Sequence, residues 1–328
     1  MNIAICIDNN FIMQAGVLLT SIINTNKNNP VTVFVFSESL NETSKEKLST
    51  ITDSTNVSLV FKKIYLASLP PLPLEGKEHI TVATYYRLLI PYLLPEDVDK
   101  ILYLDCDMIV LDSLTDFYNT DLTNTNAAAV IDMFNDDKRI NTRLHYSETA
   151  GYFNAGMLLM NLTNWRKNQI SEKAIKFLGE HPELCEAHDQ DALNHALNGD
   201  YLKVSARYNM QLDFFCDFKY LIVNESFFDD IKKSREKPCI IHFTGPTKPW
   251  LKNCYHPYMC LWDYFQDKTE WKGKEKKYEY KGAKLYKYLI KAFFIKLHLY
   301  QEKKQFLPET YIHAKTIMGK LDETKNNY

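Results

Sequence analysis

Two aspartates, Asp105 and Asp107, stand in the middle of an apolar segment that runs from Ile101 to Leu111. The apolar residues reach the edge of the acidic pair and resume directly after it, as in a buried strand that ends at a charged site. Two ionised carboxylates this close repel each other where the dielectric constant is low, so the pair requires a cation or a shared proton. Because carboxylate oxygens suit hard divalent cations, the Asp-x-Asp spacing predicts an Mg²⁺ or Mn²⁺ site. The alternative is a solvated turn between two short strands, which seldom has so many apolar neighbours.

Two enzyme classes use an acidic pair of this kind. In one class of phosphotransferases and hydrolases the first Asp is a nucleophile, and the pattern continues with Thr or Val where this chain has Ile109. That pattern also lies near the start of its domain, which is not the case here. In metal-dependent, nucleotide-sugar glycosyltransferases the carboxylates hold a cation against the diphosphate leaving group. The second class requires a nucleoside-binding strand upstream and further phosphate ligands downstream.

The sequence meets both requirements. An apolar strand over residues 2–7 leads into the polar turn 8–11 and then into a helical pattern. Downstream, His242, Gly245 and Lys248 supply an imidazole, a glycine that permits close backbone approach, and a cation within seven residues. A sugar nucleotidyltransferase would need a glycine-rich loop after the first strand, and only Gly16 lies near it, inside the expected helix.

With these motifs the chain resembles glycosyltransferase family 8, in particular the bacterial galactosyl- and glucosyltransferases of lipooligosaccharide cores and related surface glycans. The resemblance covers roughly residues 1–255 and rests on the order and spacing of several short segments. These segments are 84–88, 103–107, 112–114, 152–157, 161–162, 165–166, 189–191 and 242–250. The resemblance implies a GT-A fold and a retaining transfer from a UDP-hexose.

The resemblance also implies how the charged residues act. Asp105, Asp107 and His242 are expected as metal ligands, and one imidazole among oxygen ligands favours Mn²⁺ over Mg²⁺. Lys248 and the backbone N–H groups near Gly245 are expected to neutralise the charge that grows on the leaving diphosphate. The alternatives are a buried structural histidine and a surface lysine.

The nucleoside of the donor is expected in the turn 8–11. Asp8 would accept a hydrogen bond from the uracil or the ribose, and Phe11 would stack on the base where the family often has Tyr. The alternative for this turn is a helix N-cap, which also prefers Asp and Asn. Cys106 reads as a small strand side chain and not as a metal ligand. Further contacts with the donor are expected from Cys6, Ile7, Asn10, Cys106 and Ala155.

Sugar recognition is assigned to Asp132, Asn154, Asp189 and Gln190, because carboxylates and amides can each bind two hydroxyl groups. The resemblance places Gln190 below the anomeric carbon. An amide is a poor nucleophile without an activating base, which favours a front-face mechanism, in which the leaving phosphate helps to deprotonate the acceptor, over a covalent intermediate. Arg87 is expected between the acidic pair and the sugar, where its planar guanidinium could hold Asp105 and a sugar hydroxyl together. A structural ion pair is the alternative for Arg87.

The elements that would position these residues alternate between strands and helices. Strands are expected at 2–7, 31–36, 57–61, 100–105 and 127–131, helices at 13–25, 43–50, 79–93, 168–178 and 190–197, and a buried strand before residue 162. This alternation predicts an α/β, Rossmann-like, mainly parallel sheet with helices on both faces. With 328 residues and 45% apolar content, the chain is expected to form a catalytic domain at 1–255 and a helical C-terminal region at 256–328. Seven cysteines without a Cys-x-x-Cys pair, and neither a leader nor an 18-residue apolar run, predict a reduced cytoplasmic protein.

Residues 272–304 contain eleven Lys and three Glu, so they carry a net charge of +8 in a chain of net charge −2. Lys284, Lys287 and Lys291 form one helical stripe, with Leu285, Tyr288, Leu289, Ala292 and Phe293 beside it. Such a basic, aromatic helix is typical of peripheral binding to an anionic membrane, here the inner face of the cell membrane. A helix docked on the catalytic domain is the alternative, and the acidic remainder of the chain argues against nucleic-acid binding.

The sequence therefore predicts a UDP-hexose-dependent hexosyltransferase acting on a glycan, glycolipid or glycoprotein acceptor, with UDP-galactose favoured over UDP-glucose. A catalytically silent glycan-binding relative is the non-enzymatic alternative. Such a relative would be expected to lack Asp105, Asp107, His242 or Lys248, and all four are present.

Overall fold

The structure is a computed structural model that describes residues 1–65, 82–147, 149–297 and 306–323. Its strands are β1 (Asn2–Cys6), β2 (Val31–Ser37), β3 (Val57–Lys63), β4 (Lys100–Leu104), β5 (Met108–Val110), β6 (Ala127–Ile131), β7 (Phe153–Asn161), β8 (Leu202–Lys203), β9 (Met210–Gln211) and β10 (Ile240–His242). Its α-helices are α1 (Ile12–Thr25), α2 (Glu42–Thr52), α3 (Ile90–Leu93), α4 (Thr115–Tyr118), α5 (Lys138–Arg143), α6 (Leu162–Lys167), α7 (Ile170–Glu180), α8 (Asp189–Leu197), α9 (Phe228–Glu236), α10 (Met259–Gln266), α11 (Gly282–Lys296) and α12 (Pro308–Glu323). Short 3₁₀ helices are η1 (Asn9–Phe11), η3 (Val82–Leu89), η4 (Ala206–Tyr208), η5 (Leu212–Phe215), η6 (Phe218–Tyr220) and η7 (Glu225–Phe227).

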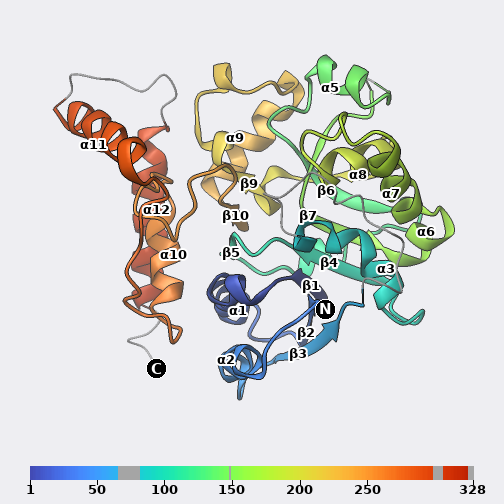
Figure 1. Cartoon of the computed structure of the whole chain (residues 1–328), viewed down its shortest axis with the longest axis horizontal. Helices are drawn as coiled ribbons and strands as arrows, with labels where there is room; N and C mark the ends of the chain where they lie inside the picture. Colours follow the sequence, from blue (N-terminus) through green and yellow to red (C-terminus); the bar gives the residue numbers. More distant parts are fainter. Residues whose placement is uncertain (66–81, 148, 298–305, 324–328) are drawn as a thin grey trace.

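The central sheet has the strand order β3-β2-β1-β4-β7-β6-β8 (Figure 1). Strands β3, β2, β1 and β4 are parallel neighbours, and β8 is parallel to β6. Strand β7 is antiparallel to both of its neighbours, β4 and β6. The prediction of a mixed, mainly parallel α/β sheet is confirmed.

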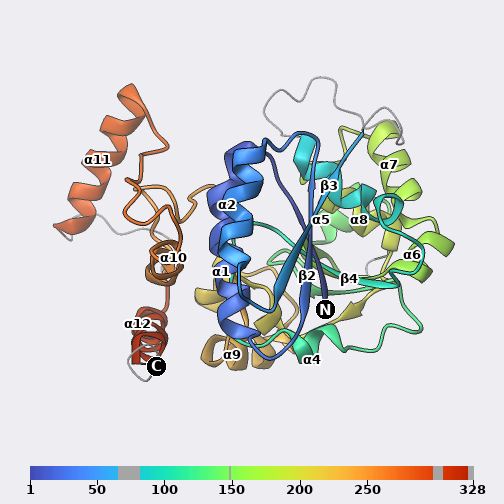
Figure 2. The ribbon, with the colours of Figure 1, turned by 90° about the horizontal axis from the view of Figure 1, so that it is seen from below.

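Both faces of this sheet are covered by helices, because its strands are apolar on both sides. Ile3 and Ile5 of β1 pack in the core under α1, whereas Ala4, between them, faces the second core with Tyr85 and Tyr103. Helices α1 and α2 lie on one side of the sheet and α6, α7 and α8 on the other (Figure 2). Successive side chains of a strand point to opposite faces of the sheet, so β1 contributes side chains to both cores.

Most expected elements agree with the structure to within two or three residues at each end. The exception is the helix expected at 79–93, of which residues 79–81 lie outside the described part of the chain. There the 3₁₀ helix η3 precedes the short α-helix α3, which has a proline in its first turn. The 3₁₀ segment still carries Arg87 into the site.

A second, small sheet lies at the end of β4 and has the order β5-β10-β9. Strand β5 pairs antiparallel with β10, so that Met108 is opposite His242. Strand β9 pairs parallel with β10 on the other side, with Gln211 opposite His242. This sheet is what brings the acidic turn after β4 next to a histidine more than a hundred residues away.

The C-terminal helices are not all detached from the catalytic core. Helix α10 packs on α1, and α12 packs on α10. Tyr258, Trp262 and Phe265 are fully buried in the same core as β1, and the ring of Trp271 lies against Gly16 of α1. Helix α11, in contrast, stands away from the sheet (Figures 1 and 2). No helix among the described residues is both long and apolar enough to cross a bilayer.

Candidate active site

The two aspartates occupy the short turn between β4 and β5. The Asp105 N–H donates a hydrogen bond to the Gly156 carbonyl of β7 at 2.8 Å, and the Phe243 N–H donates to the Asp107 carbonyl at 2.9 Å. The turn is therefore fixed on one side by the large sheet and on the other by the small sheet. The Asp105 and Asp107 side chains are 24% and 13% exposed, so both carboxylates are largely removed from water.

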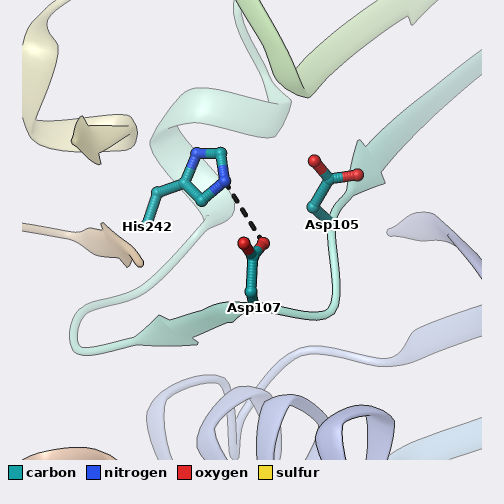
Figure 3. A group of neighbouring side chains, drawn as sticks. All are labelled: Asp105, Asp107 and His242. Carbon is teal, nitrogen blue, oxygen red and sulfur yellow. Dashed lines mark ion pairs between the residues drawn. The ribbon is translucent and has the colours of Figure 1, made fainter. Parts of the chain in front are cut away.

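Asp105, Asp107 and His242 form a group that can hold a metal ion (Figure 3). Each offers one ligand atom, and these atoms all lie within 4.8 Å of one another. His242 Nε2 lies 3.2 Å from Asp107 Oδ1. Among the described residues, none donates a good hydrogen bond to that buried oxygen. Neighbouring ligands around a cation with bonds of about 2.1 Å lie about 3 Å apart, so the residues fit a divalent ion.

Two cations flank this group and neutralise the outer side of each carboxylate. Arg87 lies 3.0 Å from Asp105 Oδ1, which also accepts a hydrogen bond from Tyr103 at 2.5 Å. The Lys248 ammonium lies 2.7 Å from Asp107 Oδ2 and donates a second hydrogen bond to a backbone carbonyl. Burial alone would raise the pKa of Asp107, but Lys248 and His242 outweigh it and hold the pKa well below its usual range. Asp107 is therefore ionised and ready to bind a cation.

Arg87 joins the acidic pair to helix α8. Its Nε lies 2.7 Å from Asp189 Oδ2, in the first turn of α8, and its Nη1 donates a hydrogen bond to the Ala155 carbonyl at 2.5 Å. Burial alone would lower the pKa of Arg87, but Asp105 and Asp189 raise it above its ordinary value. Burial raises the pKa of Asp189 to about 6 despite the neighbouring guanidinium. The structure thus contains the ion pair with Asp105, and a second one with Asp189 that the sequence did not predict.

A first cavity of about 250 Å³ opens above the acidic pair. Its wall contains most of the residues predicted to contact the donor: Cys6, Ile7, Asp8, Phe11, Arg87, Asp105, Cys106, Asp107 and Lys248. Tyr103 and Trp250 complete the wall, and the Trp250 ring lies edge-on to Phe11 with a centroid distance of 6.1 Å. Asp8 caps η1, since its carboxylate accepts from the Asn10 N–H at 2.7 Å, and it lines the cavity as well.

A second cavity, of about 660 Å³, contains the other polar residues predicted to bind sugar. Asp132, Asn154, Gln190 and Gly245 line it, together with Tyr152. The Gln190 amide is fixed at both ends: its oxygen accepts from the Ala155 N–H at 3.0 Å and its nitrogen donates to the Tyr152 hydroxyl at 3.0 Å. The segment 244–248 borders both cavities, since Thr244 and Gly245 line the second cavity and Lys248 lines the first.

Not every predicted contact residue lies on a cavity wall. Asn10 is exposed and is not part of either wall, and Ala155 takes part only through its backbone groups. His242 and Asp189 lie beneath the surface, at 4% and 3% exposure. Four residues to which no role was assigned from the sequence are built into the site: Tyr103, Tyr152, Asn209 and Trp250. Tyr103, Tyr152 and Trp250 had a signal in the sequence, because they belong to the family segments 103–107, 152–157 and 242–250, whereas Asn209 belongs to none of them.

A Rossmann-like sheet with an Asp-x-Asp turn at the end of its central strand, and a histidine beside it on a second sheet, defines a GT-A glycosyltransferase. Comparison with known proteins agrees: residues 2–254 match the sequence profile of Glycosyl transferase family 8. The chain belongs to this family, whose GT-A members use a nucleotide-sugar donor and a divalent metal. The resemblance predicted from the motifs is confirmed.

Individual relatives span nearly the whole chain. General stress protein A of Bacillus subtilis is 30% identical over 278 residues, which cover 83% of this chain and 94% of the relative. The lipopolysaccharide 1,2-glucosyltransferase of Escherichia coli K12 is 26% identical over 294 residues, with coverages of 88% and 85%. Among solved structures, the galactosyltransferase LgtC in complex with donor and acceptor sugar analogues superposes with a TM-score of 0.73 at 24% identity, covering 82% of this chain and 96% of LgtC. This last similarity establishes the fold.

Proposed function

We propose that the chain is a retaining hexosyltransferase that uses a UDP-sugar and Mn²⁺ to extend a bacterial surface glycan, lipooligosaccharide or glycoprotein. The observation that carries the proposal is the group Asp105, Asp107 and His242 at the base of a cavity that also presents a base-stacking ring and a lysine. Mg²⁺ is the alternative ion, since the two carboxylates suit either cation. A bound divalent ion would neutralise the diphosphate and so make UDP a better leaving group.

The protein's own groups would bind the donor along the first cavity. Phe11 and Trp250 offer aromatic faces for the uracil, and Asp8 a carboxylate for the ribose or base. Lys248, on the motif after β10, would leave Asp107 and donate to the diphosphate, where charge grows as the glycosidic bond breaks. Its position at the edge of the cavity, 27% exposed, suits that movement.

The hexose would lie toward the second cavity, where Gln190, Asn154 and Asp132 provide polar groups, with Asp189 beneath the surface in the same helix turn as Gln190. The Gln190 amide is held by three neighbours, and its oxygen, the atom that would have to attack, already accepts a hydrogen bond from the Ala155 N–H. This arrangement supports a front-face transfer, in which the leaving phosphate accepts the acceptor's proton, rather than a covalent intermediate. Arg87 would keep Asp189 oriented toward the sugar.

The identity of the sugar and of the acceptor rests on the relatives. Those named include the lipopolysaccharide 1,2-glucosyltransferase of Escherichia coli and a lipopolysaccharide 1,3-galactosyltransferase of Salmonella typhimurium, which is 28% identical over 255 residues. We infer a hexose donor, with UDP-galactose favoured over UDP-glucose, and a surface-glycan acceptor. The catalytic domain is proposed to be 1–255, with the helices after it as a C-terminal region of which α10 packs into the core of the catalytic domain.

We infer that the enzyme works in the cytoplasm at the inner face of the membrane, through residues 272–304. Within the described part of this range, α11 and the residue that follows it expose an apolar stripe along one side: Tyr286, Leu289, Ile290, Phe293, Phe294 and, after the helix, Leu297. Lys284 and Lys287 are exposed beside it. The other side of α11, with Leu285 and Tyr288, is partly covered, and Tyr278 and Tyr280 pack on the Tyr288 ring. An exposed apolar stripe beside lysines suits an anionic lipid surface.

Hydrolysis or transfer from a panel of UDP-sugars, with and without Mn²⁺, tests this function. The wild-type protein should consume one UDP-hexose in the presence of Mn²⁺, and chelation should stop the reaction. Asp107→Asn keeps the size and shape of the side chain and should fold, with some loss of stability because the ion pair with Lys248 is lost, yet lose the metal-dependent reaction. Undiminished turnover of that variant in chelator would contradict the proposal.

A further inference from the structure

Asn209 is a buried residue that no sequence motif marks, and it lies directly before β9. It is 0% exposed. Since β9 pairs with β10, with Gln211 opposite His242, the side chain of Asn209 comes to lie beside the histidine ring. Asn209 Oδ1 is 2.9 Å from His242 Nδ1, on the side of the ring away from the acidic pair.

Asn209 belongs to a chain of hydrogen bonds whose direction is fixed. The Gly156 N–H, which can only donate, donates to Asn154 Oδ1 at 3.1 Å. The Asn154 amide nitrogen therefore points the other way, and it donates to Asp132 Oδ2 at 3.1 Å. Because Asn154 Oδ1 also accepts from the Asn209 amide nitrogen at 2.9 Å, the oxygen of Asn209 must face His242.

The tautomer of His242 follows from this direction. An amide oxygen can only accept, so His242 Nδ1 must carry the proton and donate it to Asn209. The other ring nitrogen, Nε2, is then the one that can bind a cation, and it is the one that lies 3.2 Å from Asp107 Oδ1. Residues that fix the tautomer and orientation of a metal-binding histidine typically contribute 10- to 100-fold to metal affinity.

We propose that Asn209 is a positioning residue of the metal centre, which acts by holding His242 with Nε2 toward the ion. The inference rests on the proposed metal-dependent function, and it adds a residue that contacts neither the metal group's carboxylates nor the cavities. It also gives Asn154 a second task, since both ends of its amide are used to orient Asn209. The chain ends on Asp132, whose Oδ2 also accepts from Gln190 at 3.4 Å. The metal group and the sugar-facing amide are thus anchored to the same carboxylate.

Mn²⁺ affinity in the presence of UDP, measured by calorimetry and by electron paramagnetic resonance of free Mn²⁺, tests this role without an activity assay. Asn209→Leu, which keeps the branched shape of the side chain and removes the acceptor, should weaken Mn²⁺ binding about 10- to 100-fold. Asn209→Asp keeps an acceptor for the Nδ1 proton but sets a second oxygen against Asn154 Oδ1, so it should fold with a lower urea midpoint and still bind Mn²⁺ more tightly than Asn209→Leu. In a His242→Ala background, Asn209→Leu should cause no further loss, because the ligand that it positions is gone.

A matched control separates positioning from general damage to the core. Asn126 is likewise buried, and it donates a hydrogen bond to Asp200 and accepts one from Asn168. It lies directly before β6, at the opposite end of that strand from Asp132. Asn126→Leu should lower the urea midpoint and leave Mn²⁺ affinity unchanged. Equal losses from Asn209→Leu with and without His242, or wild-type affinity in that variant, would overturn the inference. Absence of Mn²⁺ binding by the wild-type protein would instead overturn the proposed function.

Discussion

Replacing Gly156 by alanine should disrupt the metal centre, because the added methyl group would collide with two of its expected ligands. Gly156 lies in β7, and its carbonyl accepts the Asp105 N–H. A Cβ built there would lie 2.4 Å from His242 Cε1 and 2.8 Å from Asp105 Oδ2. Since carbon atoms in contact prefer about 3.5–4.0 Å, the imidazole would have to move by roughly 1 Å. The Asp105 carboxylate cannot easily turn away, because Arg87 and Tyr103 hold its other oxygen.

The expected size of the effect follows from this displacement. Moving a group by about 1 Å in an active site can lower the rate on the order of 10²-fold, and overpacking costs about 1–3 kcal/mol of unfolding free energy. We therefore expect Gly156→Ala to fold with a lower urea midpoint, to bind Mn²⁺ and UDP weakly, and to turn over its UDP-sugar about 10²-fold more slowly.

Gly179→Ala provides the matched control for this substitution. Gly179 lies in α7, and a Cβ there would meet no atom within 4 Å. Because alanine is the better helix former, the control should gain about 0.5–1 kcal/mol of stability and keep full activity. If Gly156→Ala bound Mn²⁺ as tightly as wild type and kept its turnover, the assignment of Asp105 and His242 as ligands of one ion would be refuted.

Three further variants address the lysine, a buried histidine and the projecting helix. Lys248→Ala should lower kcat by roughly 10²–10³-fold with a smaller change in UDP affinity, whereas equal losses in both would show that Lys248 serves mainly in binding. Burial lowers the pKa of His256 to about 3, so the folded state binds fewer protons than the unfolded chain between about pH 3 and 6.5. The free energy of unfolding should therefore decrease as the pH is lowered from about 6.5 towards 3, by ~2–3 kcal/mol at pH 4.5. In urea titrations, His256→Asn should show a weaker dependence of stability on pH. Ile290→Ser with Phe293→Ser should weaken co-sedimentation with anionic vesicles, as should added salt, at unchanged turnover of soluble substrates; unchanged sedimentation would place the membrane contact elsewhere.

The features that the sequence predicted correctly depend on short, strongly patterned segments. The apolar run around Asp105 indicated a buried strand that ends in a turn, and β4 ends one residue before it. The alternation of strands and helices indicated the layered sheet, because each segment's period is a local property of the chain. Most of the residues that line the first cavity were predicted from sequence motifs to contact the donor.

The features that the sequence did not predict depend on contacts between distant segments. Asn209 meets His242 only because β9 pairs with β10, and a pairing of two residues per strand leaves no pattern to read. Arg87 reaches Asp189 across about a hundred residues of chain. On α11 the stripe beside the lysines was expected to include Leu285 and Tyr288, but tyrosines from the preceding segment cover that side. A helical period identifies the faces of a helix, and only its neighbours decide which face is exposed.

The placement of charge around the acidic pair explains how the fold tolerates two buried carboxylates and still leaves them able to bind an ion. Arg87 and Lys248 each take one oxygen, Asp105 Oδ1 and Asp107 Oδ2, on the outer sides of the pair. The oxygen of Asp107 nearest to His242 is left without a hydrogen-bond donor among the described residues. A buried carboxylate oxygen without a hydrogen-bond donor costs free energy, so a positive charge beside Asp107 Oδ1 would stabilise the fold. An ion bound there would supply that charge, and it would also reduce the attraction that holds Lys248 on Asp107, which frees the lysine for a diphosphate.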